Sequence, residues 1–309
     1  MGRIFGLGET VLDIIFKDNK PVATRPGGSA FNALVSLARA GQEVALISEI
    51  GRDMVGEQIM GFLKENQVDT SWLHRFSTGK TPVALAFLDE NNNASYQVYK
   101  DFPDERFQIV GPEFGPGDIL LFGSFFAVNP VLRKQVVPLL QKAREQGAFL
   151  IYDPNFRKNH LNNKDIYLPL IEENFSLAHL VRGSDEDFRN IFPGLDIDEV
   201  LLKIQDFDAF GLITSNSDGV YGLIDGHRFH VAARQIKTIS TIGAGDNFNA
   251  GLAYGFNEQK PGSGDVERWK TIVEKAVEFS TNVCLSFDNY ISREFAATLM
   301  TKRKEPPIS

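Results

Sequence analysis

Residues 240–251, Ser-Thr-Ile-Gly-Ala-Gly-Asp-Asn-Phe-Asn-Ala-Gly, place a glycine-rich turn and an aspartate directly before a run that is typical of a helix. Backbone N–H groups of such a turn converge at the positive end of the helix dipole, which suits a phosphate or a developing oxyanion. Asp246 would repel an anion bound there, so its position favours a general base that takes a proton from an attacking hydroxyl group. The same pattern also suits an aspartate that only caps the helix.

A second glycine pair, Gly27-Gly28, opens another helix-like run over residues 27–41, with Asn32 in its first turns. Together the two segments, one near each end of the chain, resemble the two signatures of the ribokinase-like (PfkB) family of carbohydrate kinases. The resemblance extends from Gly8 to about Ser286. It implies an α/β fold, namely a ribokinase-like three-layer domain with a central, mostly parallel sheet and helices on both faces, plus a small β-sheet lid.

The resemblance also implies roles for the residues of both signatures. Asp246 is expected to be the general base, with the backbone amides of residues 243–245 as an anion hole. Asp13 would be the family's sugar-binding aspartate, although it also suits a turn, and Asn32 could be a helix-surface amide. The residues assigned in this way are Asp13, Gly27, Gly28, Asn32, Gly243, Ala244, Gly245 and Asp246.

Residues 153–157, Asp-Pro-Asn-Phe-Arg, follow a predicted strand and resemble the Asp-Pro-Asn-x-Arg run of fructokinases and 2-keto-3-deoxygluconate kinases. Arg157 would bring a planar cation close to the phosphates or to an acidic sugar, and Asn155 is expected to contact the substrate. Lys100 close to the sugar would also favour an acidic substrate. The structural alternative is a Pro-Asn turn followed by a solvated arginine.

The nucleotide side is predicted from weaker matches. Ser184 and Asp187 fall where the family has an Asn-x-x-Glu motif that organises Mg²⁺ through water, so Asp187 is the metal candidate. A serine followed by acidic residues also suits a helix N-terminus. Asn282 matches a family position beside the adenine, and it could equally be structural.

Residues 214–219, Thr-Ser-Asn-Ser-Asp-Gly, resemble the family's Thr-x-Gly-x-x-Gly nucleotide loop. Asn216 replaces the first glycine, and Asn tolerates a positive φ. With Thr214 and Gly219, Thr241 of the second signature completes the predicted ATP site. Ser240 stands where the family often has an aspartate that helps to bind a monovalent cation, which leaves K⁺ activation open.

Composition narrows the class of protein. The chain has 309 residues with a net charge of −8, which argues against a general nucleic-acid binder. One cysteine, Cys284, excludes an intrachain disulfide, and we expect His227 and His230 to have surface or packing roles rather than to bind zinc. The sequence has neither a signal-peptide pattern nor an apolar run that could span a membrane. We therefore expect a cytoplasmic enzyme.

Short apolar runs alternate with amphipathic helical stretches, which predicts parallel strands joined by right-handed crossovers. Two segments, 10–24 and 81–101, instead alternate apolar and polar residues and are predicted to form antiparallel hairpins that build the lid. Residues 1–9, 25–80 and 102–309 would then form the main domain. The strands are expected at residues 3–7, 43–50, 119–122, 149–152, 177–181, 209–214 and 220–224, and the helices at 30–40, 130–146, 184–191, 198–203, 247–256 and 271–285.

These patterns predict an ATP- and Mg²⁺-dependent sugar kinase. No Walker P-loop is present, and residues 6–11 lack the third glycine of a dinucleotide fingerprint. Fructose phosphorylated at its 6-hydroxyl is the expected reaction, and 2-keto-3-deoxygluconate is the first alternative. A ribose or nucleoside kinase and a non-catalytic sugar sensor remain further alternatives. The partners expected are the sugar and ATP, with no nucleic acid and no membrane, and a homodimer through the lid is an open prediction.

Overall fold

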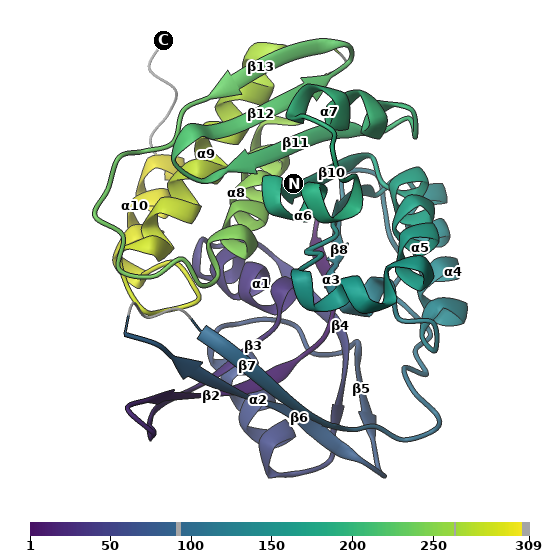
Figure 1. Ribbon diagram of the computed structural model, residues 1–309, viewed down its shortest axis with the longest axis vertical. Helices are drawn as coiled ribbons and strands as arrows, with labels where there is room; N and C mark the ends of the chain where they lie inside the picture. Colours follow the sequence, from purple (N-terminus) through teal and green to yellow (C-terminus); the bar gives the residue numbers. More distant parts are fainter. Residues whose placement is uncertain (91–93, 263, 305–309) are drawn as a thin grey trace.

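The computed structural model describes residues 1–90, 94–262 and 264–304. A nine-stranded sheet forms the middle layer, with helices on both of its faces, and a small four-stranded sheet stands at one side (Figure 1). The predicted fold class is therefore confirmed. Within the described part of the chain, no helix is long and apolar enough to cross a membrane.

The large sheet is parallel except at one edge. Neighbours from β11 to β5 run parallel, whereas β12 and β13 are antiparallel additions. In spatial order its strands are β13 (His227–Val231), β12 (Gly219–Ile224), β11 (Phe210–Ser215), β10 (Leu180–Ser184), β9 (Phe149–Asp153), β8 (Ile119–Gly123), β1 (Ile4–Leu7), β4 (Val44–Gly51) and β5 (Leu73–Phe76).

Alternate residues of each inner strand enter two separate cores. In β8, Ile119 and Leu121 pack on one face of the sheet, and Leu120 and Phe122 pack on the other. A strand that is buried on both faces must be apolar throughout, which is why these strands appear as short continuous apolar runs.

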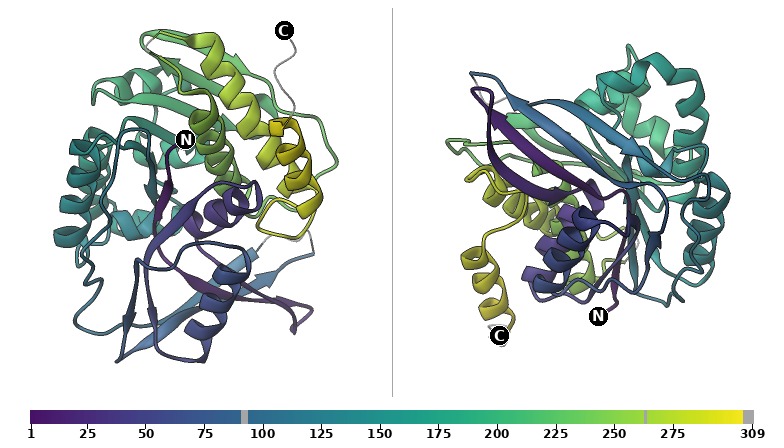
Figure 2. Two further views of the ribbon diagram at one scale, coloured as in Figure 1. Left: turned by 180° about the vertical axis from the view of Figure 1, so that it is seen from behind. Right: turned by 90° about the horizontal axis from the view of Figure 1, so that it is seen from below.

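Helices cover both faces of the large sheet, as the two views of Figure 2 show. The first core is covered by α1 (Ser29–Arg39), α2 (Met54–Glu65), α8 (Ala244–Gln259), α9 (Val266–Cys284) and α10 (Arg293–Lys304). The second is covered by α3 (Ser124–Ala127), α4 (Arg133–Glu145), α5 (Lys164–Leu177), α6 (Asp185–Ile191) and α7 (Ile197–Gln205).

The small sheet consists of the two predicted hairpins. Its order is β3 (Lys20–Gly27), β2 (Val11–Lys17), β6 (Lys80–Leu88) and β7 (Ala94–Asp101). Each hairpin is antiparallel, and the two join through a parallel pairing of β2 with β6. Residues 91–93, which we expected in the turn of the second hairpin, lie outside the described residues.

Some boundaries differ from the prediction. The expected strand at 177–181 begins only at Leu180, because Leu177 is the last residue of α5 and the apolar run spans a helix end and a strand start. The pattern gave no indication of β5, α2 or α5. His227 and His230 lie in the edge strand β13, where the His230 ring nitrogen is 2.7 Å from the Asp218 carbonyl oxygen at an exposed position.

Gly28 should be essential for the start of α1. Its φ is +132°, and an added Cβ would lie only 2.1 Å from the Glu9 carbonyl oxygen. We expect Gly28→Ala to lower the free energy of unfolding by about 1–3 kcal/mol or more, measured by urea denaturation. The control is Gly61→Ala in α2, where nothing lies within 4 Å of the added Cβ and about 0.5–1 kcal/mol of stabilisation is expected. Equal effects of the two changes would contradict this explanation.

Candidate active site

The predicted site residues gather at the carboxyl ends of the parallel strands, where open α/β sheets place their ligands. There, a groove of about 430 Å³ runs past the N-terminus of α8. The predicted residues that line it are Asn155, Arg157, Ser184, Asp187, Thr214, Asn216, Gly219, Thr241, Gly243, Ala244, Gly245 and Asp246.

Asp246 lies in the first turn of α8 and is half-buried. Its Oδ2 accepts a hydrogen bond of 2.7 Å from Asn32 Nδ2 in α1, so the two glycine-rich segments meet at this carboxylate. Burial raises the pKa of Asp246 to about 6, against the opposing effect of the hydrogen bonds from Asn32 and Ser29. A carboxylate with such a pKa is ionised at neutral pH and is a stronger base than an ordinary aspartate.

The turn before Asp246 supplies fewer amide donors than the sequence predicts. Gly243 adopts a left-handed φ of +76° and caps α8. The Ala244 amide donates to the Thr241 carbonyl oxygen at 3.2 Å, so this donor already has a partner. Gly245 and Asp246 belong to the first helical turn, whose N–H groups have no partner within the helix. Of the three amides in the predicted anion hole, only that of Ala244 therefore has a hydrogen-bond partner in the turn among the described residues.

Arg182, which the sequence analysis missed, lies beneath this turn and is only 5% exposed. Its Nη1 donates to Asp153 Oδ2 at 2.7 Å and to the Gly245 carbonyl oxygen at 3.4 Å, and its Nη2 donates to Thr214 Oγ1 at 2.9 Å. The guanidinium group therefore links the ends of β9 and β11 to the first turn of α8. A charged residue within an apolar parallel strand was the signal that could have revealed it, because such residues are seldom buried without a partner.

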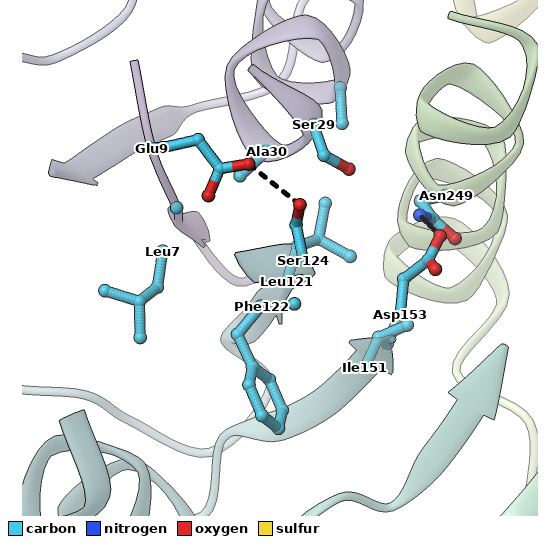
Figure 3. Close-up of a pocket in the computed structure, with 13 residues that line it drawn as sticks. Leu7, Glu9, Ser29, Ala30, Leu121, Phe122, Ser124, Ile151, Asp153 and Asn249 are labelled. Carbon is cyan, nitrogen blue, oxygen red and sulfur yellow. Dashed lines mark hydrogen bonds between the residues drawn. The ribbon is translucent and has the colours of Figure 1, made fainter. Parts of the chain in front are cut away.

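Below the site, a small cavity of about 20 Å³ lies between the ends of β1, β8 and β9 (Figure 3). On one side Ser124 Oγ donates to Glu9 at 2.8 Å, and on the other Asn249 Nδ2 donates to Asp153 at 2.7 Å. Ser29 lies between the two pairs in this view. Asp153 therefore accepts from both Asn249 and Arg182, which fixes its side chain.

Ser184 and Asp187 form a capping box at the start of α6, as the structural alternative predicted. One carboxylate oxygen, Asp187 Oδ2, accepts from the Ser184 amide and hydroxyl groups. The other, Oδ1, is buried and has no hydrogen-bond partner among the described residues, although Asp187 lines the groove. Burial and the nearby Asp153 raise the pKa of Asp187. This orphaned oxygen is the observation that fits a metal ion or its water.

The described residues contain no group of three or more His, Cys, Asp or Glu side chains that could hold a metal by themselves. A metal at Asp187 would therefore need further ligands from water and from bound phosphates. Mg²⁺ is commonly held in this way, by one or two carboxylates together with substrate phosphates.

The predicted nucleotide loop, residues 214–219, contains two residues with a positive φ. Asn216 has a φ of +39°, so asparagine does adopt the left-handed conformation in place of glycine. Gly219 has a φ of +106°, and an added Cβ would lie 2.2 Å from the Val231 carbonyl oxygen. Asn282 lies outside the groove lining, and its Oδ1 accepts the Ser292 amide at 2.9 Å. The helix face beside the groove presents Thr281 and Cys284 instead.

Two predicted cations lie beside the site. Arg157 is exposed, and its Nε donates to Asn155 Oδ1 at 2.8 Å. Lys100 of β7 places its Nζ 5.3 Å from the centre of the Phe125 ring. Burial lowers the pKa of His160, and the charges of Lys100 and Arg157 lower it further, so the three groups lie near one another.

Residues of β2, β3 and α1 also lie close to Asp246. Burial and the charge of Asp246 raise the pKa of Asp13 to about 7. Asp13 Oδ2 and Asn32 Oδ1 both lie near Gly27, 3.2 and 3.6 Å from the position that its Cβ would occupy. Burial raises the pKa of Tyr96 in β7, and the nearby charges of Asp13 and Asp246 raise it further, to about 12. The small sheet thus faces this region.

The chain matches the family model described as pfkB family carbohydrate kinase over residues 1–285. A fructokinase from Vibrio alginolyticus is 24% identical over 255 residues, which are 82% of this chain and 83% of that protein. The structure of fructokinase from Vibrio cholerae O395 in its fructose-, ADP- and calcium-bound form has a TM-score of 0.83 at 22% identity. That of aminoimidazole riboside kinase from Salmonella enterica, with aminoimidazole riboside and an ATP analogue, has a TM-score of 0.83 at 20% identity. Both cover 97% of this chain and 99% of the other.

The coupling between the two aspartates can be measured directly. Carbon-detected NMR of labelled aspartate side chains should give a pKa of about 6 for Asp246 and about 7 for Asp13. In Asp246→Asn the pKa of Asp13 should fall, because its like-charged neighbour is gone, and stay above its usual value because burial remains. The control Asp165→Asn, in the exposed first turn of α5, should leave it unchanged. An Asp13 carboxyl that titrates near 4 in the wild type would contradict the geometry.

Proposed function

The chain belongs to the pfkB family of carbohydrate kinases, and we propose that it transfers the γ-phosphoryl group of ATP to the 6-hydroxyl group of fructose. The observation that supports the proposal is the hydrogen bond from Asn32 to Asp246, which joins the two glycine-rich segments at a carboxylate with a raised pKa. We propose that the residues near Asp13 bind the sugar and that the groove beside α8 binds the phosphates. A kinase needs this arrangement because the acceptor and the nucleotide must lie in line.

In the proposed reaction the acceptor hydroxyl group gives its proton to Asp246 and receives the γ-phosphoryl group from ATP. The acceptor hydroxyl oxygen attacks the γ-phosphorus, and a bond forms between them while the bond from the γ-phosphorus to the β,γ-bridging oxygen breaks. Asp246 accepts the hydroxyl proton, and ADP departs with the electron pair of the broken bond. The amide of Gly245 is the proposed donor to the transferred group, and such donors are worth about 3–4 kcal/mol each.

The buried Arg182 supports this turn from below. It contacts Gly245 and holds Asp153, and its positive charge also opposes the burial that raises the pKa of Asp246. Mg²⁺ bound with ATP would neutralise charge on the phosphates, and Asp187 is the residue that we propose to hold its water. The small sheet of β2, β3, β6 and β7 is proposed as the lid that excludes water from the sugar.

Turnover of ATP to ADP should be measured with Mg²⁺ and a panel of fructose, 2-keto-3-deoxygluconate, ribose, tagatose 6-phosphate and adenosine. Fructose is expected to be the preferred acceptor. Asp246→Asn should lose about 10²–10⁴-fold in kcat, the range for a general base, while fructose affinity measured by calorimetry changes little. Asp165→Asn is the matched control, because it is an exposed aspartate in the first turn of another helix.

The panel also has outcomes that overturn the proposal. Asp246→Asn with more than a tenth of wild-type kcat would remove Asp246 from the reaction. Fructose binding with no turnover of any acceptor by the folded wild type would favour a sugar sensor. Preferred turnover of ribose or adenosine would keep the phosphotransfer and refute the substrate.

An acidic sugar such as 2-keto-3-deoxygluconate is the second candidate substrate. It is favoured by the cluster of Lys100, Arg157 and His160 at the lid side of the site. If this candidate is correct, the acidic sugar is the preferred acceptor, and Lys100→Met raises its KM without changing that of a neutral sugar.

We also propose that the chain forms a homodimer through the small sheet. Asp13 and Tyr96 face the site, so strand alternation and register place Ile14, Phe16 and Phe87 on the opposite face. The Phe16 and Phe87 rings stack with their centres 5.1 Å apart, and Phe87 is 39% exposed. An apolar sheet face of this kind is stabilised when a second copy covers it.

Light scattering coupled to gel filtration tests this proposal. The wild type is expected to be a dimer at micromolar concentration, and Phe87→Lys is expected to be a folded monomer, because the charge would be buried without a partner. The control is Val110→Lys, an exposed apolar residue outside the small sheet. A monomeric wild type would refute the dimer.

A further inference from the structure

Three polar side-chain atoms converge on the space above Gly27. The position that a Cβ atom of Gly27 would occupy lies 3.2 Å from Asp13 Oδ2, 3.6 Å from Asn32 Oδ1 and 3.9 Å from Asn289 Nδ2. Because glycine has no side chain, this space is left open, and the three atoms border it from three different elements. The third residue, Asn289, does not belong to either glycine-rich signature.

Asn289 is held firmly from both sides. It is only 5% exposed, and its backbone carbonyl oxygen accepts a hydrogen bond of 2.8 Å from Asn247 Nδ2 in α8. The next residue, Tyr290, donates its hydroxyl group to the Pro26 carbonyl oxygen of β3. The loop after α9 is therefore fixed between the helix that carries Asp246 and the strand that carries Gly27.

The hydrogen-bonding capacity around Gly27 is incomplete without a ligand. Asn32 Nδ2 is used by Asp246, whereas Asn32 Oδ1 is buried and has no partner in the described part of the chain. Buried polar atoms normally have partners, so an orphaned acceptor in a binding region indicates a group supplied by the ligand. The atoms above Gly27 comprise two acceptors and one amide donor, which suits hydroxyl groups that both donate and accept.

We propose that Asn289 is a specificity-determining residue for the sugar. Its side-chain amide donates to a sugar hydroxyl group, and the same hydroxyl group donates to Asp13. The site thereby selects sugars that carry a hydroxyl group at this position and rejects those that lack it, because the amide and the carboxylate would then be buried without partners. This inference rests on the proposed function, since it assumes that the ligand above Gly27 is the acceptor sugar.

Two substitutions test the role by steady-state kinetics with fructose. Asn289→Ala removes the donor, and we expect KM to rise about tenfold. Asn289→Asp keeps the shape, replaces the donor by an acceptor beside Asp13 and should raise KM further. In both variants kcat should stay within about threefold, because the base is untouched. Asn129→Asp is the matched control, because Asn129 lies in the loop between α3 and α4 and its Oδ1 accepts the Val131 amide at 3.0 Å.

Deoxy sugars identify the hydroxyl group. The wild type should bind one of 1-, 3- and 4-deoxyfructose much more weakly than it binds fructose. Asn289→Ala should bind that same analogue almost as well as it binds fructose, because the partner of the missing hydroxyl group is already absent. Such non-additivity is the signature of two groups in contact. Unchanged KM values in both Asn289 variants, or fully additive losses for every analogue, would overturn the inference.

The failure of the proposed function has a different signature. A wild type that binds fructose but phosphorylates no sugar refutes the proposed function, and calorimetry of the same variants then decides on Asn289. A wild type that neither binds nor phosphorylates any sugar overturns both.

Discussion

The hydrogen bond from Asn32 to Asp246 joins residues that are 214 positions apart, and the rest of the structure is arranged so that it can form. α1 follows β3 of the small sheet and α8 follows the edge strand β13, yet the two helices contact each other on the same face of the large sheet. Their first turns meet at this hydrogen bond. Both ends of the chain therefore contribute residues to the candidate site.

The charges around this contact determine the pKa values of the carboxyl groups in the site. Burial is the main cause that raises the pKa values of Asp246, Asp187 and Asp13. The charge of Asp153 raises those of Asp246 and Asp187 further, and the charge of Asp246 raises that of Asp13 further. One buried cation, Arg182, is shared among Asp153, Thr214 and the turn before Asp246. The carboxylates thus hold their protons more tightly than isolated ones would. This favours proton acceptance at Asp246 and cation binding at Asp187.

The sequence was sufficient where local patterns decide the outcome. The glycine pair at residues 27–28 and the capping serine predicted where α1 and α6 begin, whereas α8 begins at Ala244, three residues before the predicted start. The sequence was insufficient where tertiary contacts decide. The positions of Arg182 and Asn289 in the site could not be predicted, because their contacts come from residues that are distant in the sequence. Asn282 has the expected residue type, yet its side chain is committed to the Ser292 amide, and the Ala244 amide is committed to Thr241.

The central claim is that Asp246 acts as a base whose pKa is raised to about 6. The most direct test is the pH dependence of kcat/KM for fructose phosphorylation, because this ratio reports the groups of the enzyme before the sugar binds. A raised pKa means that the group becomes protonated as the pH falls through about 6, and a protonated carboxyl group accepts no proton. We predict that kcat/KM declines towards tenfold per pH unit below pH ~6. A kcat/KM that stays constant down to pH ~4.5 would contradict this role of Asp246.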